Sequence, residues 1–229
     1  MTAEKKALIK KCIQACINSY EGKHGKVITL FEKWVRVVYK EYIEYYFGYE
    51  GDTVYLVFRG SDEKKDWQQN LDTASFDIED GEMQRGTLED WFRIEKDILS
   101  VLENYKKIVI TGHSRGAMLA LVANYFAAEL KKEIVCVAVA PAKVISKELL
   151  HYYYNAYVIM NGEDIVCKQP FWKFADLKQF KNFIRIGKQN IFFKIPVLRL
   201  GLAWLTEKIG INDHEPELYL KNWLEYEKL

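Results

Sequence analysis

The spacing of apolar positions divides the chain into alternating helices and strands. Four short apolar runs have the continuity of strands that are buried on both faces of a parallel sheet: 53–58, 108–111, 134–139 and 157–160. Longer segments repeat their apolar residues at helical intervals: 3–20, 88–104, 118–126 and 215–228. This alternation predicts a doubly wound α/β sheet, whose reactive groups gather at the carboxyl ends of the strands.

Two predicted hairpins flank this framework. Residues 41–48 and 53–58 are apolar-rich and enclose Tyr49-Glu50-Gly51-Asp52, which predicts an antiparallel hairpin leading into a central strand. Residues 183–186 and 191–195 predict a second hairpin in the same way.

Other local patterns are less regular. Residues 34–39 fit a helix or a strand, and 75–81 are predicted to form an acidic loop. Thr87 is predicted to cap the helix that follows it, because a threonine directly before a helical apolar pattern is a common N-cap.

The composition is that of an ordinary globular protein. The chain has 229 residues, 49% of them hydrophobic, so we expect residues 1–229 to form a single domain with a full core. The formal net charge of +1 gives no support to bulk nucleic-acid binding, and no nucleic-acid partner is expected.

The sequence also favours a cytoplasmic location. The N-terminus, MTAEKKALIKKC, has no uninterrupted apolar core of the kind found in signal peptides. The longest apolar run, 195–205, is shorter than the roughly 18 residues of a membrane span. The four cysteines are expected to be reduced and mostly buried, and no Cys/His group has the spacing of a metal site: Cys12, Cys16, Cys136 and Cys167.

The sequence Gly112-His113-Ser114-Arg115-Gly116 lies between a predicted strand and a predicted helix. This strand–turn–helix context favours a nucleophile elbow over a chance G-x-S-x-G match. The two glycines suit a turn in which strand and helix approach closely and the serine backbone is strained. The pattern predicts an exposed Ser114 hydroxyl at a helix N-terminus, where the free N–H groups favour developing negative charge.

The stretch TGHSRGAMLALVAN resembles the elbow of the class 3 lipases, a branch of the α/β-hydrolases, with Arg115 where that family usually has Leu. The resemblance runs from about Glu41 to Tyr219. It implies an α/β-hydrolase fold, with a mostly parallel central sheet and helices on both faces. Residues 62–72 resemble a Trp-rich stretch that partly forms the family's lid. Gln84-Arg85-Gly86-Thr87 departs from the family's His-x-Gly-Phe, so no functional residue is assigned there.

A second matching motif is Phe58-Arg59-Gly60-Ser61. In the family, the residue after this glycine supplies the first oxyanion-hole donor, so the match assigns the Ser61 backbone N–H. The Arg115 N–H, one residue past the nucleophile, is the second donor that the resemblance implies. The alternative for Ser61 is a simple turn or helix-cap serine.

The histidine of the triad follows from chain order, because an α/β-hydrolase places its serine, acid and histidine in that sequence. His24 precedes the serine, His113 lies inside the elbow and is expected to point away, and His151 lies before the best acid. His214 remains. Its surroundings, Asp213 to Leu220, resemble the family signature in which the catalytic histidine shortly precedes Tyr-Leu.

Asp164 is the predicted acid. It follows a predicted strand in Asn161-x-x-Asp164-x-Val166, which matches the family motif. Glu163 is the alternative, but neighbouring residues on an extended chain face opposite ways. Asp213 is adjacent to His214 and is poorly placed to bond its Nδ1.

Residues 168–199 carry eight Lys or Arg against one acid, together with seven Phe or Trp. One interpretation is structural, with buried aromatic rings and solvated lysines. The other is peripheral contact with an anionic membrane, because interleaved basic and aromatic residues suit a lipid interface.

Together these features predict a serine carboxylic-ester hydrolase that forms an acyl-serine on small-molecule or lipid esters and needs no cofactor. Two alternatives stay open. One is a lipase-like binding module without turnover, and the other is an acyltransferase or amidase that uses the same triad.

Overall fold

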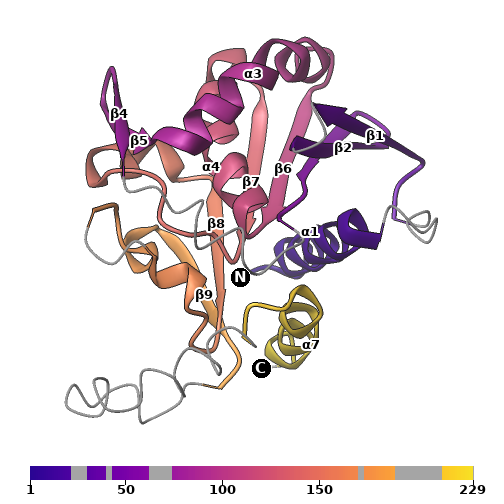
Figure 1. Cartoon of the computed structure of the whole chain (residues 1–229). Coiled ribbons are helices and arrows are strands. Elements are labelled where there is room, and N and C mark those ends of the chain that lie inside the picture. The colour runs from indigo at the N-terminus through magenta and orange to yellow at the C-terminus, as the bar shows by residue number, and fades with distance from the viewer. Residues whose placement is uncertain (22–29, 40–42, 62–73, 170–172, 189–212, 229) are drawn as a thin grey trace.

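The computed structural model describes residues 1–21, 30–39, 43–61, 74–169, 173–188 and 213–228. Its centre is a seven-stranded sheet in the order β1-β2-β3-β6-β7-β8-β9 (Figure 1). The strands are β1 (Lys33–Tyr39), β2 (Ile43–Glu50), β3 (Thr53–Phe58), β6 (Lys107–His113), β7 (Glu133–Val139), β8 (Ala156–Asn161) and β9 (Asn182–Ile186). The first three pair antiparallel, and β3 through β9 pair parallel.

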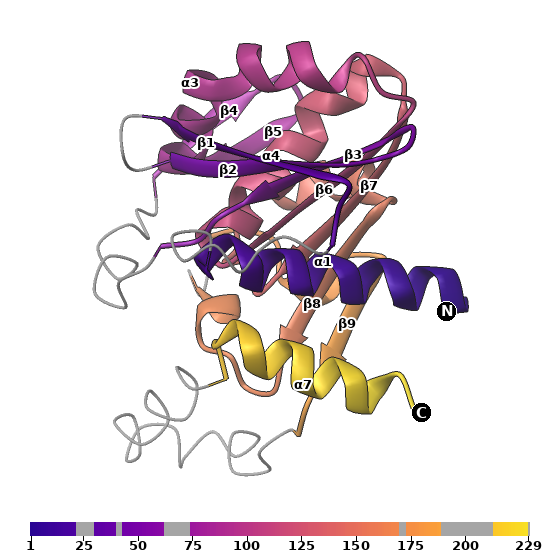
Figure 2. The same cartoon turned by 90° about the vertical axis from the view of Figure 1, so that its right-hand side faces the viewer.

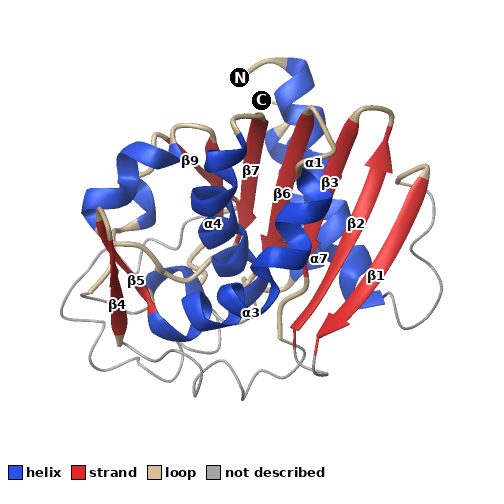
Figure 3. Ribbon diagram, turned by 90° about the horizontal axis from the view of Figure 1, so that it is seen from above, coloured by secondary structure: helices blue, strands red, loops and turns tan. Residues whose placement is uncertain are grey.

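Helices cover both faces of this sheet (Figures 2 and 3). On one face lie α3 (Arg85–Leu102) and α4 (Arg115–Ala127), and on the other lie α1 (Ala3–Glu21) and α7 (Pro216–Tyr226). The continuous run 116–124 of α4 is buried, as expected for a helix enclosed between the sheet and α3. The predicted mostly parallel sheet with helices on both faces is therefore confirmed.

Short elements complete the described chain. A separate two-stranded ribbon is formed by β4 (Ser75–Ile78) and β5 (Gly81–Gln84). Four 3₁₀ helices lie in the connections: η2 (Ala128–Leu130), η3 (Lys147–Tyr153), η4 (Val166–Lys168) and η5 (Leu177–Gln179).

The register of the sheet brings the carboxyl ends of its parallel strands to one edge. Phe58 at the end of β3 lies opposite Gly112 in β6, and His113 lies opposite Val139 at the end of β7. The segments after β3, β6 and β8 contain the predicted site residues, so this register gathers them at the same edge.

Two local predictions are wrong. Residues 75–81 are not simply a loop, because 75–78 form a strand that pairs with β5 and only 79–80 make the turn between them. The acidic side chains of this segment are exposed, while Met83 of β5 is buried. Thr87 does not cap α3. Gln84 does so, since its Oε1 accepts from the Thr87 N–H at 2.7 Å and from the Thr87 hydroxyl at 2.6 Å.

Other predictions are settled only in part. Residues 33–39 are a strand rather than a helix, and 183–186 belong to β9, which pairs parallel with β8. The other half of that predicted hairpin, 191–195, lies outside the described residues, as does the lid-like stretch 62–72.

Candidate active site

The elbow has the strained geometry that its sequence predicts. Ser114 joins β6 to α4 with φ 57° and ψ −124°, a conformation that is uncommon for a residue with a side chain. The expected exposure is wrong, however, because Ser114 is only 6% exposed. Neighbouring strand ends enclose the turn: the Ser114 N–H donates to the Val139 carbonyl at 3.0 Å, and Gly116 packs on the end of β3.

The glycines on either side of the serine allow this close packing. A Cβ on Gly112 would lie 2.2 Å from the Gly116 carbonyl oxygen. A Cβ on Gly116 would lie 2.3 Å from the Phe58 carbonyl oxygen. Both distances are far inside van der Waals contact, and both obstacles are backbone atoms that cannot rotate away.

We therefore expect Gly116→Ala to lower stability by about 3 kcal/mol or more, since overpacking in a core costs about 1–3 kcal/mol even when side chains can adjust. The matched control is Gly86→Ala in α3, where the nearest atom would lie at 3.5 Å. The control should be neutral or slightly stabilising, because alanine favours helix. Thermal unfolding of both variants tests this, and equal shifts in Tm would contradict it.

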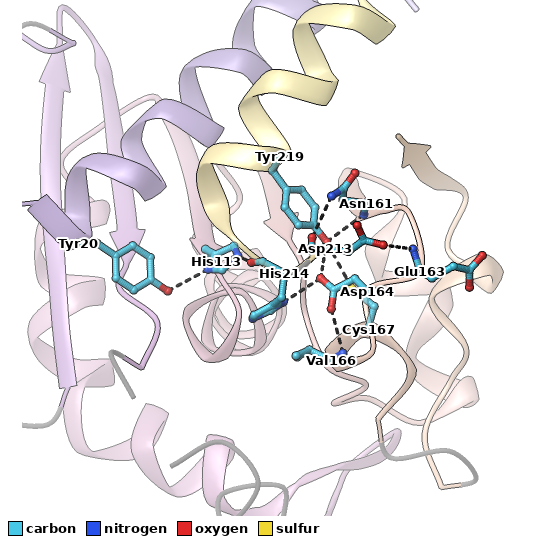
Figure 4. A network of polar contacts seen from close by, with 10 residues as sticks. All are labelled: Tyr20, His113, Asn161, Glu163, Asp164, Val166, Cys167, Asp213, His214 and Tyr219. Atoms are coloured by element: carbon cyan, nitrogen blue, oxygen red, sulfur yellow. Dashed lines mark hydrogen bonds and ion pairs between the residues drawn. The ribbon is translucent and has the colours of Figure 1, made fainter. Parts of the chain in front are cut away.

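The predicted acid and base are in direct contact (Figure 4). His214 Nδ1 lies 2.8 Å from Asp164 Oδ2. The Asp164 carboxylate is completely buried and accepts two further hydrogen bonds, from the Tyr219 hydroxyl at 2.6 Å and from the Val166 N–H at 2.9 Å. Because a buried carboxylate needs such partners, these bonds fix its orientation.

Sequence reasoning missed the part played by Tyr219. Burial raises the pKa of this phenol well above its ordinary value, and the charge of Asp164 raises it further, so the hydroxyl stays a donor. The same oxygen accepts the Asn161 N–H at 2.9 Å, which fastens the start of the acid loop to α7. The available signal was the Tyr-Leu pair after His214, which served only to identify the histidine.

The two alternative acids have other partners. Glu163 pairs with Lys168 Nζ at 2.7 Å and with Arg185 Nη2 at 2.9 Å. Asp213 accepts the Glu163 N–H at 2.8 Å, and its burial raises the pKa of its carboxyl. Asp164, by contrast, bonds the His214 imidazole directly. Two basic residues of 168–199 thus hold the acid loop.

The remaining predicted residues lie at the same edge. Ser61 follows β3 and is half-buried, and Arg115 is the first residue of α4, where backbone N–H groups lack partners within the helix. The Arg115 side chain forms an ion pair with Asp90 of α3, which also accepts from Arg93 Nη1 at 2.9 Å. The elbow helix and α3 are thus joined through this arginine.

One point differs from the fully assembled triad that the sequence predicts. Among the described residues, no hydrogen bond joins Ser114 to His214; catalytic hydrogen bonds are often long without substrate and tighten in its complex. The ring of His113, which the sequence predicts to point away from the serine, lies beside His214, with the two ring centroids 4.7 Å apart. In the described part of the chain, no group of three or more His, Cys, Asp or Glu side chains is placed to hold a metal ion.

The family Lipase (class 3) matches residues 55–174, more than half of the chain. The chain belongs to the class 3 lipases. A class 3 lipase is a serine lipase-type carboxylic ester hydrolase, so the enzyme class expected from the sequence is confirmed. No curated protein sequence matches this class 3 lipase.

Solved structures of fungal lipases share the fold of this class 3 lipase. A mutant of MDLA from Penicillium cyclopium is 18% identical with a TM-score of 0.69, over 83% of each chain. Rhizomucor miehei triacylglyceride lipase is 16% identical with a TM-score of 0.64, over 82% of this chain and 80% of that one. A triacylglycerol lipase whose catalytic centre is described as a serine protease triad is 17% identical with a TM-score of 0.62, over 74% and 76%.

Within the described residues of this class 3 lipase, no helix is long and apolar enough to cross a membrane.

Proposed function

We propose that Ser114, His214 and Asp164 form the catalytic triad of this lipase. The observation that carries the proposal is the His214–Asp164 hydrogen bond of 2.8 Å, whose carboxylate is fully buried at the sheet edge that also bears the elbow. In this assignment Asp164 holds the Nδ1–H tautomer, so that Nε2 is the atom of His214 that accepts a proton.

The assigned reaction proceeds in two balanced halves. Ser114 Oγ attacks the acyl carbon while its proton passes to His214 Nε2, and the C–O bond to the alcohol then breaks as that proton moves to the leaving oxygen. Water then attacks the acyl-serine while its proton passes to His214 Nε2. The bond to Ser114 Oγ breaks as that proton returns to the serine, and the carboxylic acid is released. No metal or organic cofactor enters either half.

Two backbone N–H groups are proposed to stabilise the tetrahedral oxyanion, those of Ser61 and Arg115. Their segments end at the same edge because Phe58 of β3 lies opposite Gly112 of β6. Removing one such donor typically costs about 2.7–4 kcal/mol of transition-state stabilisation. The role of Arg115 does not depend on its side chain, which is directed to Asp90.

The proposed substrates are lipid esters, in keeping with the triacylglycerol and triacylglyceride lipases that share the fold. The test is hydrolysis of p-nitrophenyl esters of increasing chain length, run beside triglyceride and phospholipid. Release of the alcohol with water as acceptor supports the proposal. Turnover that requires an added alcohol as the acyl acceptor would favour the acyltransferase alternative. Cleavage of amides in place of esters would favour the amidase alternative.

Contact between 168–199 and an anionic membrane is a further proposal. The described residues of this segment support it only through their exposed positive charges. Phe174 and Phe180 are buried, while Lys173, Lys178 and Lys181 are exposed beside them. Each basic residue near an anionic surface contributes about 1 kcal/mol of binding.

We expect wild-type protein to sediment with anionic but not neutral vesicles, less so at high salt because salt screens charges beyond about 8 Å. The triple variant Lys173→Glu/Lys178→Glu/Lys181→Glu should lose this binding. Equal partitioning to both vesicle types, or to neither, would leave only a structural role for the segment.

Two broader proposals concern the whole chain. All four cysteines are free and buried thiols, which supports action in a reducing, cytoplasmic environment. Seven strands drawn from residues 33–186 share one sheet, and α1 packs beside α7 on the same face, which supports a single domain over 1–229.

A further inference from the structure

His113 lies where the strand of the nucleophile meets the loop of the base. It is the last residue of β6, directly before Ser114, and only 3% of it is exposed. Its Nε2 lies 2.9 Å from the backbone carbonyl oxygen of His214, and its Nδ1 lies 2.9 Å from the Tyr20 hydroxyl (Figure 4). The ring thus connects α1 with the loop that bears His214.

The chemistry of the three groups fixes which of them donates each hydrogen bond. A carbonyl oxygen can only accept, so His113 Nε2 carries the proton and donates to His214. In a neutral imidazole Nδ1 is then the acceptor, and the Tyr20 hydroxyl donates to it. Burial lowers the pKa of His113 well below its ordinary value, and a charge on His214 lowers it further, so the ring stays neutral.

Tyr20 also contacts the segment that bears Ser61. A Cβ on Gly60 would lie 2.1 Å from the Tyr20 hydroxyl and 2.6 Å from the His113 carbonyl oxygen. The Arg59 guanidinium lies 5.6 Å from the centre of the Tyr20 ring. The end of β3, the elbow and the His214 loop therefore meet around one Tyr20–His113 pair.

We propose that Tyr20 and His113 are positioning residues that hold the main chain of His214 in place beside the nucleophile. The proposal rests on the triad assigned above. Asp164 bonds Nδ1 of the His214 ring. The bond from His113 holds the main chain of the same residue, so that the ring and the backbone of His214 are both anchored. Such control matters because a displacement of about 1 Å can cost about 100-fold in rate.

Three variants separate positioning from packing. The amide nitrogen of His113→Gln can reach the place of Nε2 and donate to His214, whereas the shorter His113→Asn can replace only Nδ1 toward Tyr20. Tyr20→Phe removes one hydroxyl and keeps the ring. The control is Tyr153→Phe, which removes a buried hydroxyl bonded at 3.1 Å to the Leu121 carbonyl, away from the triad.

We expect His113→Asn to lower kcat about tenfold or more with little change in KM, and His113→Gln to recover most of that loss. Tyr20→Phe should fall between them, and Tyr153→Phe should lower Tm without lowering kcat. Equal kcat for the Gln and Asn variants would overturn the proposal and leave His113 as a packing residue.

A readout without turnover separates this proposal from the assigned reaction. The Nδ1 proton of His214, shared with Asp164, should give a downfield NMR signal that broadens or shifts in His113→Asn and is retained in His113→Gln. An unchanged signal in both variants would also overturn the proposal. If wild-type protein hydrolyses no ester, the proposed function fails, and this spectral comparison still decides whether His113 positions His214.

Discussion

Ser114→Ala is expected to abolish ester hydrolysis while the protein remains folded. Loss of a triad nucleophile typically lowers kcat by roughly 10⁶-fold, because no other group can form the acyl intermediate. The change removes one oxygen and leaves the strained backbone, which is set by the packing of Gly112 and Gly116 against neighbouring main chain. Initial rates on a p-nitrophenyl ester, together with thermal unfolding, measure both effects.

The double variant Ser114→Ala/His214→Ala should be hardly less active than either single variant, since residues of a triad act as a unit. Ser146→Ala is the control: Ser146 Oγ accepts the Glu82 N–H at 3.0 Å, away from the elbow, and its loss should leave kcat unchanged. Losses that multiply in the double variant would show that the serine and the histidine act independently.

Asp164→Asn is expected to have the second largest effect, about 10⁴-fold in kcat, the size typical when an amide replaces a triad carboxylate and favours the wrong histidine tautomer. In this protein the carboxylate also accepts from Tyr219 and Val166, which hold it so that Oδ2 faces His214. An amide in the same place can offer an N–H toward Nδ1, which reverses the bond that Asp164 accepts.

Glu163→Gln is the matched comparison, because it changes the adjacent residue in the same way. Glu163 pairs with Lys168 and Arg185, so the variant should lose some stability and keep kcat within a few-fold. A greater loss of kcat in Glu163→Gln than in Asp164→Asn would reverse the assignment of the acid. Asp213→Asn should likewise act mainly on stability, since its carboxylate accepts the Glu163 N–H.

The sequence was sufficient for the features that repeat along the chain. Buried strands and helices follow from apolar periodicity, and the elbow follows from two glycines whose neighbouring backbone atoms leave no room for a Cβ. The order of serine, acid and histidine then leaves one histidine, and its partner lies 2.8 Å away in the structure.

The features that the sequence did not predict depend on contacts between distant segments. The sequence predicts that His113 points away from the serine, but it does not predict that its ring bonds to the His214 carbonyl and to the Tyr20 hydroxyl. The β4–β5 ribbon was missed because each of its strands has only four residues, which is the shortest run that a strand pattern can be recognised from. The cap of α3 was misplaced because glutamine is an uncommon N-cap residue.

Covalent labelling tests the central assignment most directly. A fluorophosphonate probe reacts with a serine only when a neighbouring base activates it, so we expect stoichiometric modification of the wild-type protein, mapped by peptide mass spectrometry to Ser114. Labelling should be lost in Ser114→Ala, nearly lost in His214→Ala and retained in Glu163→Gln. Labelling at another residue, or undiminished labelling of Ser114 in His214→Ala, would contradict the proposed triad.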